Sequence, residues 1–177
     1  MHKRRIKIIE SKKIYTGTVS LRLDKFVFDD KIIKKEIVEH LPSVGVVPIL
    51  DNEYILFVSQ YRHAARKTLL EIPAGKIEKG ETPRQAALRE MAEEIGYVGK
   101  LLPLLKIYLA PGYDTELIHI YIATDLKKIK RANRDDDEDI TIKRIKLTTA
   151  IEKCVDGQVE DCKSIAAILT YARIMYR

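Results

Sequence analysis

The pattern of apolar and polar positions divides the chain into strand-like and helix-like stretches. Apolar and polar side chains alternate over the first forty residues, and a period of two is typical of strands with one buried face. Asp29-Asp30 predicts a turn between two of these short antiparallel strands. Residues 44–50 and 53–58 are more uniformly apolar, and Asp51-Asn52 between them predicts a hairpin of more deeply buried strands.

A helix is predicted over about residues 83–95. Thr82 with Gln85 three positions later forms a capping box, and Pro83 suits the first helical position. Gly96 can end the helix in the left-handed conformation that glycine adopts without strain. One face of this helix is apolar and is expected to lie against the core. It consists of Leu88, Met91, Ala92 and Ile95.

Strands return after this helix, at residues 104–109, 117–123 and 140–147, and a charged loop precedes the last of them. Two further helices are expected at about residues 148–156 and 163–176. Strands before, between and after helices are typical of a mixed α/β domain with helices on both faces of one sheet.

A break near Pro42 divides the chain. Residues 1–41 are expected to form a small N-terminal antiparallel sheet, and residues 42–177 are expected to form the main domain. A sheet of three short strands is only marginally stable alone, so it must pack on the rest of the chain or on a second subunit.

The composition fits one hydrophobic core and excludes several classes of protein. With 46% hydrophobic and 33% charged residues among 177, the chain carries too much apolar material to be disordered. No apolar run approaches the roughly 18 residues of a membrane span, and no apolar stretch follows the basic N-terminus as in a signal peptide. We therefore expect a cytoplasmic protein without a membrane partner.

The net charge of +6 permits an anionic partner without identifying one. The basic stretches at residues 3–5 and 127–131 lack the interleaved aromatic side chains of a surface that stacks on bases. Solvated charge explains these stretches better than nucleic-acid binding does, so nucleic acid is not an expected partner.

Three glutamates of the predicted helix gather on the side away from its apolar face: Glu90, Glu93 and Glu94. Glu90 and Glu94 are like charges four residues apart, which destabilises a helix by about 0.2–0.5 kcal/mol. The helix dipole near the C-terminal end disfavours these charges further. A divalent cation would reverse both effects, whereas a solvated acidic face, with Arg89 paired to Glu93, is the simpler alternative.

The glutamates belong to a longer pattern of 23 residues that begins at Gly75 and ends at Tyr97. Its fixed residues are Gly75, Glu81, Arg89, Glu90, Glu93, Glu94 and Gly96. The pattern resembles the Nudix box, the signature of hydrolases that cleave a nucleoside diphosphate linked to another group. The resemblance implies an α/β/α sandwich around a mixed sheet, which agrees with the α/β class reached from the pattern of strands and helices.

The resemblance also implies a divalent metal site, with Mg2+ as the expected ion and Mn2+ as a substitute. By this resemblance Glu90, Glu94 and the carbonyl of Ala74 are metal ligands, and Glu93 is a further ligand or orients the attacking water. Magnesium accepts one or two carboxylates together with several waters, so this set of oxygen donors suits it. The residues expected to hold the loop and the helix together are Gly75, Glu81 and Arg89.

A second element lies fifteen residues beyond Gly96, counted to Pro111. Residues 110–116 resemble the Ser/Ala-Pro-Gly-x-x-x-Glu element of ADP-ribose pyrophosphatases, a branch of the same family, although Pro-Gly is also an ordinary turn. By this resemblance Glu116 contacts substrate. Arg62 matches an arginine that binds phosphate, a role that suits its planar guanidinium, and a surface charge at a strand end is its alternative.

An acidic run at residues 135–139 is the third element, and taken alone it is a solvated loop. In the ADP-ribose branch a Glu-x-Glu-Asp loop closes over the site and supplies the catalytic base. The resemblance puts Glu138 at a metal-contacting position and Asp136 at the position of the base. Because glutamate is usual at that position, the identity of the base stays open among Asp136, Glu138 and Glu93.

The expected reaction is metal-dependent hydrolysis of the pyrophosphate bond of ADP-ribose to AMP and ribose 5-phosphate. A second hypothesis keeps the fold and changes the substrate to another nucleoside diphosphate sugar, a dinucleotide or capped RNA. A third is a Nudix-fold ligand-binding module without catalysis, which the intact set of glutamates disfavours. In the ADP-ribose branch the N-terminal sheet is commonly exchanged between two subunits, so the resemblance also implies a homodimer.

Overall fold

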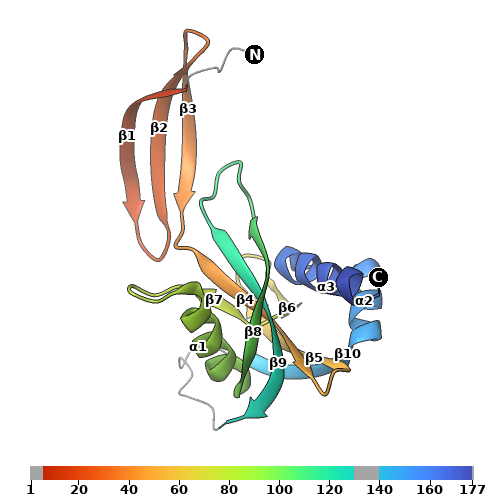
Figure 1. The fold of residues 1–177 in the computed structure, drawn as a ribbon. Coiled ribbons are helices and arrows are strands. Elements are labelled where there is room, and N and C mark those ends of the chain that lie inside the picture. Colours follow the sequence, from red (N-terminus) through yellow and green to blue (C-terminus); the bar gives the residue numbers. More distant parts are fainter. Residues whose placement is uncertain (1–5, 130–139, 177) are drawn as a thin grey trace. The chain divides into compact units, whose positions relative to one another are not determined.

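The structure, a computed structural model, describes residues 6–129 and 140–176 (Figure 1). Contacts within the chain divide it into two compact units. The first comprises Met1–Pro42 and Tyr108–Leu117, and the second comprises Ser43–Ile107 and Ile118–Arg177. The return of residues 108–117 to the first unit is not predicted by the sequence, which assigns residues 42–177 to one domain.

The first unit is built on a three-stranded antiparallel sheet in the order β1-β2-β3. Its strands are β1 (Lys7–Thr16), β2 (Ser20–Phe28) and β3 (Lys31–Glu39). The predicted turn between β2 and β3 contains Asp29 and Asp30 at φ of 47° and 62°, and such a left-handed pair is typical of a two-residue hairpin. Every residue of β1 is exposed, so this strand buries neither face within the described chain.

Residues 108–117 join this sheet along β3. The backbone amide of Val38 donates a hydrogen bond to the carbonyl of Tyr113 at 2.7 Å, and the amide of Thr115 donates one to the carbonyl of Val38 at 3.1 Å. Val38 and Asp114 also form a parallel bridge. These backbone bonds explain why the segment belongs to the first unit.

The second unit contains a seven-stranded sheet with the main order β10-β5-β4-β9-β8 (Figure 1). The strands of this order are β10 (Ile140–Lys146), β5 (Tyr54–Arg62), β4 (Ser43–Leu50), β9 (Leu117–Lys128) and β8 (Tyr97–Tyr108). Two shorter strands, β6 (Lys67–Glu71) and β7 (Ala74–Lys76), pair with β5 and β4. β4 runs parallel to β9 and antiparallel to β5 and β7, so the sheet is mixed, as predicted.

Parts of this sheet differ from the sequence prediction. The sequence does not predict β6 and β7, because five and three residues are too few to show a period of two. It predicts β8 only from Leu104 onward, whereas the strand begins at Tyr97. Gly99 and Pro103 interrupt the alternation in the first half of β8, which conceals the strand from a periodicity argument.

The helices of the described chain are α1 (Pro83–Ile95), α2 (Leu147–Val155) and α3 (Cys162–Met175). The predicted caps of α1 are confirmed, since Thr82 and Gln85 form the capping box and Gly96 is left-handed at φ 72°. Of the predicted apolar face of α1, Met91 and Ile95 are buried, whereas Leu88 and Ala92 are only partly buried. Ala86 and Ala87 are buried without having been predicted. Within residues 6–129 and 140–176, no helix is both long enough and apolar enough to span a membrane.

The two faces of β4 carry the two layers of the core. Val44 and Val46 pack in one cluster with Met91 of α1. Val47, the next residue along the strand, is fully buried outside that cluster on the opposite face of β4, and α3 also contacts β4. Helices therefore cover both faces of the mixed sheet, and the expected α/β/α arrangement is confirmed (Figure 1).

Candidate functional site

Glu90 of α1 lies directly against the backbone of Gly75 in β7. α1 packs on both β4 and β7, and Gly75 pairs with Val44 of β4. A Cβ added at position 75 would come closer than 3.0 Å to the carboxylate of Glu90, which is nearer than real Cβ contacts come. The absence of a side chain at Gly75 is therefore what admits the Glu90 carboxylate to this position.

Glu94 lies one helical turn further along α1 and reaches the first residue of β7. Only 7% of Glu94 is exposed. Its Oε2 accepts a hydrogen bond from the backbone amide of Ala74 at 3.1 Å. The structure thus brings together Ala74 and Glu94, two of the residues that the sequence analysis nominates as metal ligands.

Arg89 of α1 donates hydrogen bonds to three carboxylates and to the backbone of the segment before the helix. Its Nε donates to Glu81 Oε1 at 2.8 Å and its Nη2 to Glu81 Oε2 at 3.0 Å. Its Nη1 donates to Glu90 at 2.8 Å and to Glu93 at 3.1 Å, while Nη2 also donates to the carbonyl of Lys76 at 2.9 Å. These bonds fix the loop against the helix at the level of Glu90.

The hydrogen bonds of this network shift the pKa of Glu81 and of Arg89. The hydrogen bond from Arg89, with a second from the backbone amide of Glu78, lowers the pKa of Glu81 to about 2. The hydrogen bond to Glu81 and the neighbouring charge of Glu90 raise the pKa of Arg89 well above its ordinary value. Arg89 therefore stays charged and keeps Glu81 ionised.

The solvated acidic face offered as the simpler alternative does not describe these glutamates. The side chain of Glu93 is 35% exposed, but that of Glu90 is 12% exposed and Glu94 is buried. Helical periodicity correctly separates the glutamates from the main apolar face, but it does not predict that β7 covers two of them.

Within residues 6–129 and 140–176, no group of three or more His, Cys, Asp or Glu side chains is arranged to hold a metal ion. In this arrangement Arg89 neutralises Glu90 and Glu93, and Glu94 turns to a backbone amide. The remaining two carboxylates that the sequence nominates, Asp136 and Glu138, lie outside the described residues.

Arg62 at the end of β5 is held by a buried carboxylate. Its Nε donates to Glu71 Oε1 at 2.7 Å and its Nη2 to Glu71 Oε2 at 2.9 Å, while its side chain remains 40% exposed. The bond to Glu71 raises the pKa of Arg62 despite partial burial. Burial alone would raise the pKa of Glu71, but Arg62 and Lys163 outweigh it and lower the pKa. Arg62 is therefore a fixed cation and not a loose charge at a strand end.

Glu116 belongs to the first unit, where it lies beside His40. Glu116 Oε1 is 3.6 Å from His40 Nδ1, and both side chains are largely buried. His40 Nδ1 is 2.7 Å from the carbonyl of Leu41, which can only accept, so Nδ1 carries a proton. Thr115 exchanges hydrogen bonds with the backbone of His40 at 3.0 and 3.1 Å, which fixes this turn.

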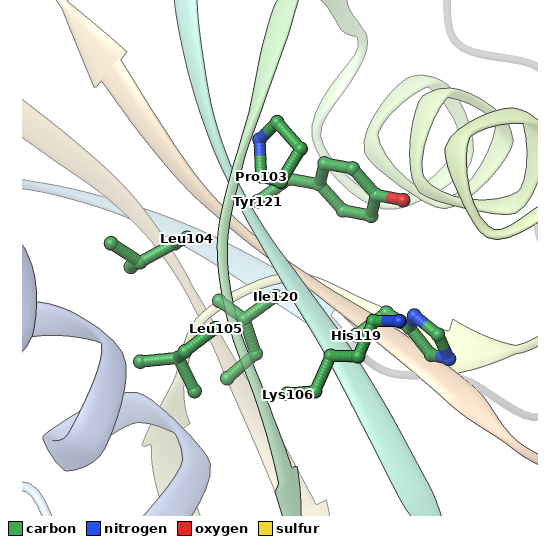
Figure 2. Close-up of a pocket in the computed structure, with 7 residues that line it drawn as sticks. All are labelled: Pro103, Leu104, Leu105, Lys106, His119, Ile120 and Tyr121. Atoms are coloured by element: carbon green, nitrogen blue, oxygen red, sulfur yellow. The ribbon is translucent and has the colours of Figure 1, made fainter.

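A separate pocket of about 250 Å³ lies over β8 and β9 (Figure 2). It is lined by Pro103, Leu104, Leu105, Lys106, His119, Ile120 and Tyr121. Figure 2 shows the ammonium nitrogen of Lys106 directed toward the His119 ring, and burial together with this charge lowers the pKa of His119. No residue that the sequence nominates for catalysis, substrate or metal lines this pocket.

The sequence does not single out three residues that contact the predicted site residues or their partners: Glu71 and Lys163 in the second unit, and His40 in the first. Glu71 and His40 contact their partners through strand pairings and turns that a single sequence does not reveal. Lys163 leaves one local signal, because a lysine in the first turn of a helix opposes the helix dipole and so calls for an anionic partner.

Comparisons with known proteins find relatives over most of the chain. Residues 39–159 match the sequence model of the NUDIX domain. The chain is 36% identical over 169 residues to an ADP-ribose pyrophosphatase of Bacillus subtilis (strain 168), covering 92% of this chain and 90% of that protein. It is 37% identical over 166 residues to a methanol dehydrogenase activator of Bacillus methanolicus, with 92% and 90% covered.

The fold also matches a solved structure, the crystal structure of an ADP compounds hydrolase. The TM-score is 0.87 at 21% sequence identity, and the match covers 98% of this chain and 95% of the other. The domain match spans most of the chain and includes β7 and α1, which carry Gly75, Glu90 and Glu94. The chain therefore belongs to the NUDIX family of hydrolases.

Proposed function

We propose that this NUDIX hydrolase cleaves the pyrophosphate bond of ADP-ribose in a metal-dependent reaction that yields AMP and ribose 5-phosphate. The observation that carries the proposal is the gathering of Ala74, Glu90 and Glu94 around β7, with Arg89 beside them. The likeness to an ADP-ribose pyrophosphatase over nine-tenths of both chains supports the choice of substrate.

The residues at β7 suit a hard divalent cation in their chemistry. Glu90 and Glu94 offer carboxylate oxygens and Ala74 a carbonyl oxygen, which are the donors that Mg2+ and Mn2+ prefer, and Gly75 makes the room that Glu90 occupies. In the proposal Glu138 completes this donor set. When bound, such a cation neutralises charge on the phosphate oxygens and makes water a better nucleophile.

The remaining roles fall to residues that bind substrate or move a proton. In the proposal Arg62 holds a phosphate with the part of its guanidinium that Glu71 leaves exposed, and Glu116 contacts the substrate. Asp136, Glu138 or Glu93 takes the proton of the attacking water. Arg89, Glu81 and Gly75 hold the glutamates in place.

The proposal includes a homodimer formed through the N-terminal sheet. Large apolar side chains of this sheet are exposed in the single chain: Ile8, Ile9, Ile14, Tyr15 and Ile32. Such a group of exposed apolar residues on an all-exposed strand is typical of a surface that another chain covers. A second copy of this chain is the occupant that an isologous dimer requires.

A panel of nucleoside diphosphate derivatives, incubated with the enzyme and Mg2+, tests the substrate. The proposal predicts that AMP appears fastest from ADP-ribose. Rapid turnover of a GDP-sugar, a dinucleotide or capped RNA, beside indifference to ADP-ribose, would overturn the substrate and keep the reaction class. No hydrolysis of any compound would favour a ligand-binding module.

A further inference from the structure

Lys163 occupies a position that local energetics disfavour. It is the second residue of α3, where the helix dipole repels positive charge, and its side chain is only 9% exposed. A buried ammonium needs anionic partners to remain charged. The partners of Lys163 therefore indicate why a lysine stands at this position.

Two carboxylates surround the ammonium of Lys163. Nζ donates to Glu71 Oε2 at 2.5 Å and to Asp161 Oδ1 at 2.9 Å. Burial would lower the pKa of Lys163, but the charges of Asp161 and Glu71 outweigh it and raise the pKa. Lys163 is thus a charged residue that fixes the Glu71 carboxylate from the side of α3.

The Glu71 carboxylate holds Arg62 from the other side. Both of its oxygens accept from the guanidinium, at 2.7 and 2.9 Å, through Nε and Nη2. Nη1 makes no hydrogen bond within the described residues, and the Arg62 side chain is 40% exposed. One edge of the guanidinium is therefore committed to Glu71, and the rest is open to an anion from solvent.

The same turn of α3 also supports the backbone that leads into β7. Ser164 Oγ accepts a hydrogen bond from the amide of Ile72 at 2.8 Å, and Asp161 caps α3 through the amide of Ser164 at 3.0 Å. Ile72 lies two residues before Ala74. The start of α3 thus supports the candidate site at two places, at Glu71, which holds Arg62, and at the segment before β7.

We propose that Lys163, acting through Glu71, is a positioning residue that holds the Arg62 guanidinium in place for the diphosphate of the substrate. The inference rests on the proposed function, in which Arg62 binds that diphosphate. A planar guanidinium gains its advantage over a point charge from orientation, so a residue that fixes its plane raises substrate affinity without touching substrate. The simpler alternative is that the ion pair of Lys163 and Glu71 only stabilises the packing of α3 against β6.

Steady-state kinetics with ADP-ribose and saturating Mg2+ distinguish the positioning role from a purely structural one. Lys163→Met is expected to raise KM at least about fivefold with kcat within about twofold, because binding that is lost equally from the ground state and the transition state raises KM and leaves kcat unchanged. Glu71→Gln is expected to do the same. In an Arg62→Met background Glu71→Gln should cause no further rise, since both residues act through one group. A KM unchanged in folded Lys163→Met, or rises that multiply in the double variant, overturns the proposal.

Lys67→Met is the matched control. Lys67 of β6 also pairs with a glutamate just before α3, Glu160, at 2.7 Å, but its side chain is 48% exposed. Its backbone lies opposite Arg62 in the β5–β6 pairing, whereas its ammonium binds Glu160 and not Glu71. Lys67→Met therefore removes a lysine–glutamate pair between β6 and the residues at the start of α3. The proposal predicts a wild-type KM for this variant. If Lys163 and Glu71 only hold α3 against β6, Lys163→Met lowers the melting temperature and leaves KM unchanged.

Exchange of the Arg62 Nε proton with water, measured by NMR without substrate, tests the positioning independently of any activity. The resonance is identified by its loss in Arg62→Met. Slow exchange is expected in the wild type and in Lys67→Met, with exchange at least several-fold faster in Lys163→Met or, should that variant not fold, in Glu71→Gln. Unchanged exchange in a folded variant overturns the positioning role. If the wild type does not hydrolyse ADP-ribose, the substrate proposal fails alone and exchange still decides the role of Lys163.

Discussion

The carboxylate of Glu90 occupies the space beside Gly75 that a side chain at position 75 would need. The contact joins β7 to the middle of α1, and Arg89 donates to the same carboxylate at 2.8 Å. The position of Glu90 thus depends on a residue fifteen positions earlier in the sequence, which contributes only the absence of a Cβ.

Gly75→Ala is expected to displace Glu90 and reduce activity by about 10–100-fold, the range observed when residues that support metal ligands are changed. The melting temperature should fall only slightly, because the atoms that an added Cβ would meet are the carboxylate end of Glu90, a flexible side chain that can turn away. Turnover and melting temperature measured on the same preparation check both effects.

Gly157→Ala controls for the loss of stability. Gly157 has a φ of +72°, which strains alanine, but an added Cβ meets no atom within 4 Å. This variant should melt at a lower temperature and keep its activity. Equal losses of activity in the two variants would mean that the glycine contact does not act through Glu90.

The stability of the protein should depend on Glu81 in acid. The pKa of Glu81 in the folded protein, about 2, lies below its ordinary value of 4.5 because Arg89 binds the ionised form. Its contribution is therefore complete above about pH 4.5 and is lost as the pH falls toward about 2. Melting temperatures over this window should fall less steeply in Glu81→Gln than in the wild type.

Glu78→Gln serves as the control for that experiment. Glu78 lies in the same turn, and its side chain makes no hydrogen bond to Arg89 among the described residues. It should keep the wild-type slope. An identical slope in Glu81→Gln would show that the bond to Arg89 does not contribute to acid stability.

Divalent cations should stabilise the fold. Ions that bind the folded chain only, at about 100 times their Kd, contribute about 2.7 kcal/mol, which is roughly 5–10 °C in melting temperature for a chain of this length. Mg2+ or Mn2+ should raise the wild-type melting temperature, and Glu94→Gln should reduce that rise. A melting curve indifferent to both ions would count against the metal site.

In the proposed dimer, the partner chain covers one face of the N-terminal sheet, and a lysine introduced on that face should disrupt the dimer. Ile8 pairs with Phe26 and Ile32 pairs with Val27, so the two exposed isoleucines lie on opposite faces. Light scattering should give twice the mass of one chain for the wild type. Ile8→Lys or Ile32→Lys should shift that mass toward the monomer, whereas a monomeric wild type would contradict the dimer.

Local signals carried most of the fold prediction. The capping box of Thr82 and Gln85 and the left-handed Gly96 involve residues within a few positions of each other, so their effect does not depend on the rest of the chain. The same holds for the hairpin between β4 and β5, where Asp51 and Asn52 adopt φ of 54° and 56°.

The contacts that fix the candidate site are not local. Arg62 finds Glu71 because β5 pairs with β6, a strand too short to show a period, and Glu71 in turn finds Lys163 from α3. Periodicity separates Glu94 from the main apolar face, but its burial depends on β7, which the pattern does not reveal. The residue types of the site could therefore be predicted, and their partners could not.

The central claim is that the carboxylates of α1 catalyse hydrolysis of a nucleoside diphosphate derivative with a divalent metal. Its most direct test is the rate of AMP release from ADP-ribose with Mg2+ by the wild type and by Glu94→Gln, which keeps the shape of the side chain and removes its charge. We predict AMP and ribose 5-phosphate from the wild type and a rate at least about 100-fold lower from the variant. A rate near that of the wild type in folded Glu94→Gln would contradict the claim.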